Sequence, residues 1–168
     1  MNFCVLGAHA WGTALAIQLT RRGHSVSLVP DQIDVAMALA SSRENSDFLP
    51  GVILPLQLQI GLEVKPVLME ADVVILACPA QQLNTVLETV AECMDSSTAL
   101  KLVVTLGEGF EEKVQADSLV HELLPGVAFA QLTALGSAED LAAGLPGIVS
   151  LNSSDEGNLL SQVSEALG

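Results

Sequence analysis

The sequence predicts an α/β fold, in which helices cover both faces of a doubly wound, mostly parallel sheet. Three observations lead to this prediction. Segments of strand and helix character alternate along the whole chain, and the strongest strand segment is apolar without alternation, as strands buried on both faces are. The 168 residues suffice for one core without disulfides or metal, and no repeat, linker or low-complexity tract divides them. We therefore expect one domain over residues 1–168.

The first two dozen residues predict a strand, a glycine turn and a helix. An apolar run at 3–6 leads into Gly7-Ala8-His9-Ala10-Trp11-Gly12, and residues 13–22 have helical character up to Gly23. This order is typical of the first half of a dinucleotide-binding unit, whose turn has the pattern G-x-G-x-x-G. Its middle glycine lets a pyrophosphate approach backbone N–H groups, but here that position is His9, whose imidazole occupies the same space. The residues alone fit an ordinary turn without nucleotide equally well.

The next segment offers a candidate for the ribose of such a nucleotide. Residues 25–29 alternate as in a second strand, and Asp31 lies nineteen residues after Gly12, where dinucleotide folds place the acid that binds a ribose 2′-hydroxyl. A carboxylate there favours NAD over NADP, because it repels a 2′-phosphate. The alternative is a simple turn at Pro30-Asp31, in which Asp31 or Asp34 caps a helix over 35–41.

The rest of the chain continues the alternation. We expect residues 42–58 to be irregular, 58–60 to form a short strand, and 62–70 to form a short helical or turn segment. We expect further strands at 71–78, 100–105, 127–132 and 147–151, and helices at 82–93, 112–124, 137–143 and 155–167. The strand at 71–78 has the strongest pattern. Ser153, Ser154 or Asp155 would cap the last helix.

Composition excludes several classes of function. The net charge is −14, of which residues 61–168 carry −13, so the surface repels nucleic acid and anionic membranes. No apolar run reaches membrane-helix length, and no basic residue precedes the first apolar run as it would in a signal peptide. The odd number and wide spacing of Cys4, Cys78 and Cys93 fit free thiols in a reducing cytoplasm. The three histidines are scattered, which predicts no metal site. Ser137 lacks a G-x-S-x-G turn, which argues against a hydrolase.

Four motifs in order resemble one known family. Positions 7–16 read G-A-H-A-W-G-T-A-L-A, and positions 43–55 contain R-E-N, L-P-G and L-P. Positions 71–72 read A-D, positions 77–81 read A-C-P-A-Q, and positions 144–146 read G-L-P. This set, at these intervals, resembles the NAD(P)-dependent glycerol-3-phosphate dehydrogenases and covers nearly the whole chain. It is far more specific than a single glycine pattern.

The resemblance implies a function and a domain organisation. Members of that family interconvert dihydroxyacetone phosphate and glycerol 3-phosphate with a nicotinamide cofactor, a step of glycerophospholipid metabolism. They carry an N-terminal Rossmann-like cofactor domain and a C-terminal helical substrate domain. By that measure this chain is the cofactor domain alone, and either the missing C-terminal domain or self-association would cover the surface that domain normally meets. Together, the resemblance and the spacing of Asp31 imply cofactor contacts at Gly7, Ala8, His9, Ala10, Trp11, Gly12, Asp31, Pro79 and Ala138.

The chain also departs from the family at three places. The middle glycine is His9, the family's T-K-G is Thr105-Leu106-Gly107, and its S-G-P-S-F-A is T-A-L-G-S-A at 133–138. A leucine cannot donate to a carbonyl oxygen, and Lys101 lies roughly 16 Å away along the same strand, toward the other end of the sheet. We therefore assign no catalytic residue and expect weak NAD binding and no activity from this chain alone.

Two alternatives stay open. One is a degenerate dinucleotide fold that serves as a non-catalytic binding or interaction module. The other is a dehydrogenase of the same fold class that acts on a different small substrate.

Overall fold

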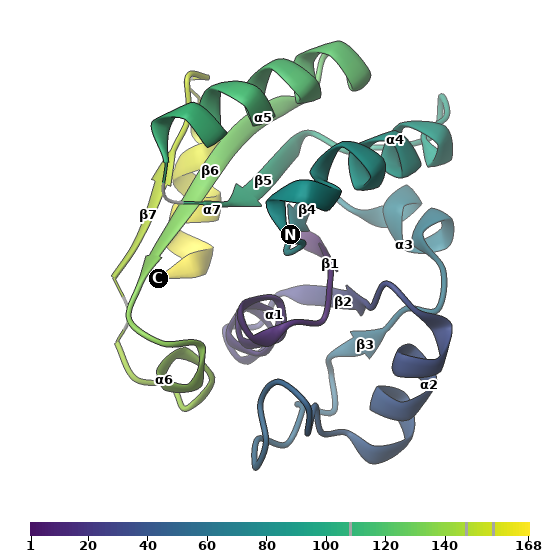
Figure 1. The fold of residues 1–168 in the computed structure, drawn as a ribbon, viewed down its shortest axis with the longest axis vertical. Coiled ribbons are helices and arrows are strands. Elements are labelled where there is room, and N and C mark those ends of the chain that lie inside the picture. Colours follow the sequence, from purple (N-terminus) through teal and green to yellow (C-terminus); the bar gives the residue numbers. More distant parts are fainter. Residues whose placement is uncertain (108, 147, 156) are drawn as a thin grey trace.

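A seven-stranded sheet forms the centre of the molecule, with the strands in the order β3-β2-β1-β4-β5-β6-β7 (Figure 1). The structure is a computed structural model, and it describes residues 1–107, 109–146, 148–155 and 157–168. The strands are β1 (Asn2–Leu6), β2 (Ser25–Val29), β3 (Gln59–Ile60), β4 (Val73–Leu76), β5 (Leu102–Leu106), β6 (Ala128–Leu135) and β7 (Ile148–Asn152). All neighbouring pairs are parallel except β6 and β7, which are antiparallel.

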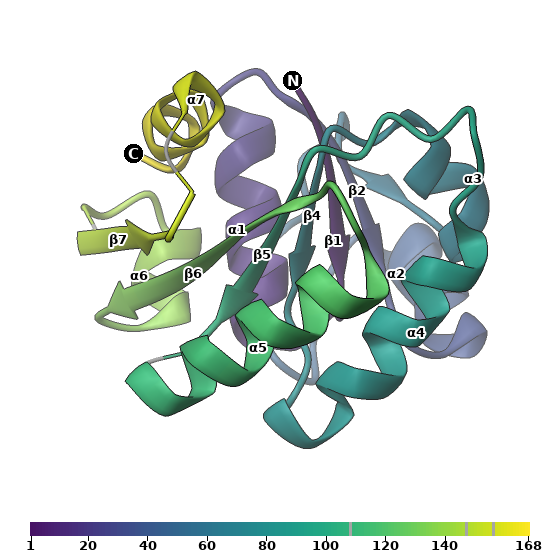
Figure 2. The same ribbon diagram turned by 90° about the horizontal axis from the view of Figure 1, so that it is seen from above.

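Helices cover both faces of this sheet, as Figure 2 shows. One layer contains α1 (Ala10–Arg21), α6 (Ala138–Ala142) and α7 (Asn158–Leu167), and the opposite layer contains α3 (Val64–Glu70), α4 (Leu83–Cys93) and α5 (Phe110–Leu123). The helix α2 (Ile33–Ser42) lies beside the edge strand β3, and a short 3-10 helix, η1 (Ala80–Gln82), precedes α4. The predicted doubly wound, mostly parallel α/β fold is confirmed.

The central strands are buried because each supplies apolar side chains to both layers. In β1, Phe3 and Val5 pack with the α1 layer, whereas Cys4 and Leu6 pack with the α4 layer. All four residues of β4 are at most 1% exposed. A parallel strand with helices on both faces has no solvated side, which explains the apolar runs in the sequence.

The order of the strands creates a switch point between β1 and β4. From β1 the chain runs outward to β2 and β3, and it then returns to form β4 on the other side of β1. The connections after β1 and β4 therefore diverge at the carboxyl edge, next to the paired residues Leu6 and Leu76. In open α/β sheets, ligands bind in the crevice at this position.

Several predicted boundaries need correction. Helix α1 begins at Ala10 rather than residue 13, and β6 continues to Leu135 instead of ending at 132. The alternative in which Asp31 or Asp34 caps this helix is wrong, because Gln32 occupies the N-cap of α2 and its side chain makes no capping hydrogen bond. The predicted start of the last strand at Gly147 lies outside the described residues.

The predicted cap of the last helix is also wrong, and the structure gives the reason. Gly157 occupies the N-cap position of α7. Ser153 donates its hydroxyl proton to the carbonyl oxygen of Phe129, and a carboxylate oxygen of Asp155 accepts from the Phe129 N–H at 3.1 Å. These side chains thus satisfy the backbone of β6 just before its pairing with β7 begins, so they do not cap the helix.

No helix among the described residues is long and apolar enough to span a membrane.

Candidate functional site

The turn between β1 and α1 requires glycine at two positions. Gly7 has φ +107°, and a Cβ there would lie 2.3 Å from the carbonyl oxygen of Ala77. A Cβ on Gly12 would lie 2.2 Å from the carbonyl oxygen of Gly7. Because these neighbours are backbone atoms, they cannot move aside as a flexible side chain can. The two glycines therefore let the turn and α1 pack directly against the end of β4.

A cavity of about 240 Å³ opens at the carboxyl ends of β1 and β2, beside this turn. Gly7 and His9 line it from the turn, Asp31 from the residues after β2, and Gln82 and Thr89 from the η1–α4 segment. Its remaining walls are mostly aliphatic, with Leu6, Val29, Ile33, Leu62, Val64 and Val86 among them. Asp31 is an exposed residue of this lining, and none of the described lining residues is Lys or Arg.

His9 occupies the N-cap position of α1. Its carbonyl oxygen accepts from the Thr13 N–H at 3.0 Å, but its side chain makes no capping hydrogen bond. The imidazole contacts the ring of Phe48 edge to face, with the ring centroids 4.8 Å apart. The side chain that replaces the middle glycine is thus held against the 43–58 segment and forms part of the cavity wall.

Asn45 holds the 43–58 segment against the turn, and sequence reasoning assigned it no role. Its side-chain amide donates to the Ala8 carbonyl oxygen at 2.8 Å and to the Thr13 hydroxyl at 2.9 Å. The residue is only 3% exposed. The place of Asn45 in the R-E-N motif is the sequence signal that could have identified this role, because a polar residue inside a family motif has either a ligand or a backbone partner.

Arg43, the first residue of this segment, holds the segment's last residues in place. Its backbone is left-handed, with φ 56°, and its guanidinium donates to the carbonyl oxygens of Pro55 and Leu58. Residues 43–58 therefore form an ordered support for the turn, although the sequence pattern predicted only irregular structure there.

A second cavity, of about 220 Å³, lies at the carboxyl ends of β5 and β6. Trp11, Leu106, Gly107, Leu132 and Ala134 line it. Within this lining, the Trp11 indole N–H is the one side-chain group that can donate a hydrogen bond. The backbone around it is well held, because the Thr133 hydroxyl donates to the Gly107 carbonyl oxygen at 2.9 Å. Leu106 thus places an apolar side chain where the family has lysine.

From the sequence, cofactor contacts are expected at Pro79 and Ala138, and Lys101 is excluded as a substitute for the family's lysine. Pro79 is exposed after β4, at the start of η1. Ala138 begins α6 and is 4% exposed, so its side chain is part of the core. Lys101 precedes β5, at the opposite end of that strand from Leu106.

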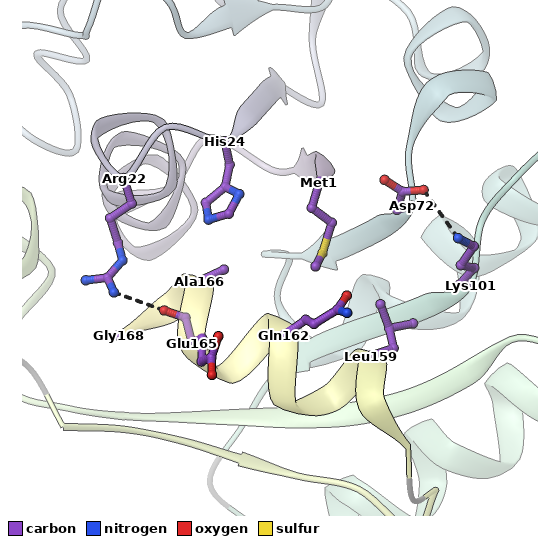
Figure 3. A pocket seen from close by; sticks show the side chains of 10 residues that line it. All are labelled: Met1, Arg22, His24, Asp72, Lys101, Leu159, Gln162, Glu165, Ala166 and Gly168. Atoms are coloured by element: carbon purple, nitrogen blue, oxygen red, sulfur yellow. Dashed lines mark hydrogen bonds and ion pairs between the residues drawn. The ribbon is translucent and has the colours of Figure 1, made fainter.

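Lys101 belongs to a larger cavity, of about 900 Å³, at the amino ends of the strands (Figure 3). Its ammonium lies 3.8 Å from the Asp72 carboxylate, while Arg22 reaches across to the backbone of Glu165 on α7. Desolvation lowers the pKa of His24 in this cavity, and the N-terminal amine and Arg22 lower it further. Although it is larger, this cavity lies away from the switch point, so we place the candidate site at the carboxyl edge.

The cysteines and histidines offer no second site. The described residues contain no group of three or more His, Cys, Asp or Glu that could hold a metal ion. Burial raises the pKa of the Cys4 thiol to about 12. It also raises the pKa of the Cys78 thiol, which lines the cavity of about 240 Å³ beside Asp31.

Comparison with known proteins agrees with this geometry. Residues 2–159 match the family described as NAD-dependent glycerol-3-phosphate dehydrogenase N-terminus. A glycerol-3-phosphate dehydrogenase [NAD(P)+] from Pelodictyon phaeoclathratiforme is 34% identical over 159 residues, which are 92% of this chain and 47% of that protein. The enzyme of the same name from Rhodospirillum rubrum is 34% identical over 99% of this chain and 47% of its own length. The chain spans about half the length of the curated relatives it matches.

Solved structures give the same result for the fold. The glycerol-3-phosphate dehydrogenase from Coxiella burnetii superimposes with a TM-score of 0.81 at 27% identity, covering 99% of this chain and 49% of that one. A GDP-mannose dehydrogenase from Pseudomonas aeruginosa reaches 0.79 at 14% identity, covering 99% of this chain and 44% of that one. At such low identity the second likeness concerns the fold alone.

Proposed function

This chain belongs to the NAD-dependent glycerol-3-phosphate dehydrogenase family, as its N-terminal NAD-binding domain, and we propose that it is the nucleotide-binding half of an oxidoreductase and does not complete the reaction by itself. The observation that carries the proposal is the cavity at the switch point, where the turn at Gly7, the carboxylate of Asp31 and the start of α4 meet. In a bound dinucleotide the nicotinamide ring accepts or releases the hydride. The residues of this chain would bind and orient that molecule.

We propose NAD rather than NADP as the preferred nucleotide. Asp31 would accept hydrogen bonds from ribose hydroxyl groups, whereas a 2′-phosphate would meet its negative charge. No described residue lining the cavity supplies a Lys or Arg to offset that repulsion. Because His9 narrows the approach to the backbone N–H groups of the turn, we expect NAD to bind with a dissociation constant of about 1 mM, or about −4 kcal/mol.

The substrate half of the reaction needs a donor where the family has its lysine, and the described residue at that position is Leu106. A carbonyl that accepts hydride is stabilised by a donor close to its oxygen. Leu106 and Ala134 supply no donor. We therefore expect the purified chain not to oxidise glycerol 3-phosphate with NAD or NADP. Activity above background, abolished by Gly12→Ala and retained by Asn84→Ala, would contradict this.

The partner that completes the site is also a proposal. Phe110 begins α5 just after β5, and Leu135 ends β6, so both lie at the carboxyl edge. They are 78% and 59% exposed. Apolar side chains of this size beside a candidate site suit a contact with a second domain or a second copy. We propose that such a contact, made by the equivalent of the relatives' other half or by self-association, covers this edge.

The runner-up function is a non-catalytic binding module. The lining around Leu106 favours it, because its described residues include no titratable group and only one side-chain donor, the Trp11 indole N–H, and such a lining offers no acid–base chemistry. A calorimetric titration of the chain with NAD distinguishes the two functions: NAD binding supports a cofactor domain, and its absence up to 10 mM, about tenfold above the expected dissociation constant, favours the module.

A further inference from the structure

We propose that the cavity of about 900 Å³ at the amino ends of the strands is a second binding site, and that its ligand is an aliphatic carboxylate, a small organic anion with one charged end and one apolar end. This cavity lies at the opposite edge of the sheet from the cavity beside Asp31, and the two share no described lining residue. The inference therefore goes beyond the proposed function and does not depend on it.

The cavity is formed between the strand ends and the last helix. His24 precedes β2, Asp72 precedes β4 and Lys101 precedes β5, so these residues line it from the amino edge of the sheet. Helix α7 lines it from the other side, where Leu159 and Gln162 face the strand ends (Figure 3). The volume lies within the roughly 300–1,000 Å³ that is typical of small-molecule sites.

The lining differs in charge from the chain as a whole. The chain has 6 Lys and Arg against 20 Asp and Glu, whereas the cavity is lined by two of each kind: Arg22 and Lys101, and Asp72 and Glu165. A chain with a net charge of −14 exerts no general attraction on anions. An anion that binds here must therefore be held by a particular basic group.

Lys101 is not that group, because its charge is already compensated. Its ammonium lies 3.8 Å from one oxygen of the Asp72 carboxylate. The other oxygen of this carboxylate accepts from the Asn2 N–H at 2.9 Å. An anionic group at this end of the cavity would meet the charge of Asp72, so the ligand carries one anionic group rather than two.

Arg22, at the other end of the cavity, keeps donors for a ligand. Its guanidinium donates to the backbone carbonyl oxygen of Glu165 at 3.0 Å, as Figure 3 shows, and it forms no ion pair with a carboxylate among the described residues. Desolvation lowers the pKa of the neighbouring His24, and the N-terminal amine and Arg22 lower it further, so the field at this end is positive. A guanidinium has five N–H groups in a planar fork that fits a carboxylate.

Between the two charged ends the lining is apolar. The side chains of Met1 and Leu159 lie there in Figure 3, both partly buried and packed against the core, and Ala166 is 4% exposed. An aliphatic chain on this surface removes apolar area from water, and each methylene that is half buried raises the affinity about twofold. A guanidinium at one end of an apolar floor thus fits a carboxylate with an aliphatic chain better than an inorganic anion.

The test is an NMR titration of the full chain, because its three histidines report on three different places. His24 lines this cavity, His9 lines the cavity beside Asp31, and His121 lies on α5. Hexanoate should shift the ring signals of His24 and leave those of His9 and His121 in place. For so small a ligand we expect a dissociation constant of about 1–10 mM.

Two matched ligands separate the contribution of charge from that of apolar contact. Hexan-1-ol has the same aliphatic chain without the charge, and it should bind about tenfold more weakly because the charge-assisted hydrogen bonds to Arg22 are lost. Butanoate keeps the charge but has two methylene groups fewer, so it should bind about fourfold more weakly than hexanoate.

Substitutions assign the two contacts. Arg22→Gln should weaken hexanoate about tenfold and leave hexan-1-ol within twofold. Lys65→Gln is an equal charge change on the exposed surface of α3, outside the cavity, and should leave both ligands within twofold. Leu159→Ala should remove most of the difference between hexanoate and butanoate. If Arg22→Gln does not fold, the three ligands compared on the natural sequence still decide the question.

Three results would overturn the proposal. The first is equal binding of hexanoate and hexan-1-ol, or an equal effect of Arg22→Gln and Lys65→Gln. The second is a His24 signal that does not move up to about 100 mM hexanoate, tenfold above the weakest expected dissociation constant. The third is a shift of His9 rather than His24, which would place the ligand in the cavity beside Asp31. None of them bears on NAD binding, because the two ligands are detected at different histidines.

Discussion

The Asn45 amide is the tie between the 43–58 segment and the glycine turn, and its removal should destabilise the whole domain. In Asn45→Ala, the carbonyl oxygen of Ala8 and the hydroxyl of Thr13 lose their partner, and Thr13 is fully buried. A buried polar group left without a partner costs about 1–3 kcal/mol. Because relaxation around one deleted side chain is shared, we expect a total of about 3 kcal/mol rather than the sum of two maximal costs.

That loss is large enough to measure without ambiguity. For a domain of this size it corresponds to a fall in Tm of roughly 6–12 °C. Urea unfolding followed by circular dichroism gives the free energy, and Trp11, the one tryptophan of the chain, reports locally beside the turn.

The matched control is Asn84→Ala. Asn84 is exposed on α4, where its amide donates to Glu88 at 3.2 Å, so its loss should change the stability by less than about 0.5 kcal/mol. A cost below about 1 kcal/mol for Asn45→Ala, or an equal cost for both variants, would show that the segment is held by something other than this amide.

Three further predictions concern packing, protonation and association. Gly12→Ala should lower the free energy of unfolding by roughly 3 kcal/mol, because the added Cβ would meet backbone atoms. Gly51→Ala, at φ +82° with open space around it, should lower it by about 1 kcal/mol. Equal losses in urea unfolding would refute the close-packing argument. By NMR titration, His121 should have a pKa above its ordinary 6.5, because the Asp117 carbonyl and carboxylate favour its charged form. His24 should have a pKa below 6.5, because of desolvation. A pKa of His24 above that of His121 would contradict both predictions. The raised pKa means that the stabilisation by His121 is present at acidic pH and is lost as the pH rises through the folded-state pKa, so His121→Gln should remove that part of the pH dependence. The exposed apolar edge predicts a dimer by light scattering at high protein concentration, which a strictly monomeric species would contradict.

The sequence predicted best those elements whose burial is uniform. β4 and the β1–turn–α1 unit followed from apolar runs and from glycines at which the structure has no room for a side chain. The direction of β7 did not follow, because a short apolar segment has the same pattern in parallel and antiparallel pairs. The caps failed for a related reason: Ser153 and Asp155 have good capping chemistry, but tertiary partners on Phe129 compete for them.

For the candidate site, the sequence identified Asp31 and His9 but not the residue that holds the turn in place. Asn45 is remote in the sequence and becomes important only through hydrogen bonds to Ala8 and Thr13. Periodicity describes which face of an element is buried, and it contains no information about a polar contact between a loop and a turn. Ala138 is a motif position expected to contact cofactor; its side chain lies in the core, so the expected contact would involve its backbone and stays a prediction.

The contact between the first and last helices has a consequence for the order in which the domain is made. Gln18 on α1 donates to the Leu167 carbonyl oxygen of α7 at 2.7 Å, across 149 positions of sequence. At ribosomal rates of about 5–20 residues per second, roughly 7–30 s separate the synthesis of these two partners. For most of that interval α1 has neither α6 nor α7 beside it, because α6 is translated only at residues 138–142 and α7 only at its end. The helix that carries the glycine turn is therefore among the first elements to leave the ribosome and among the last to be enclosed.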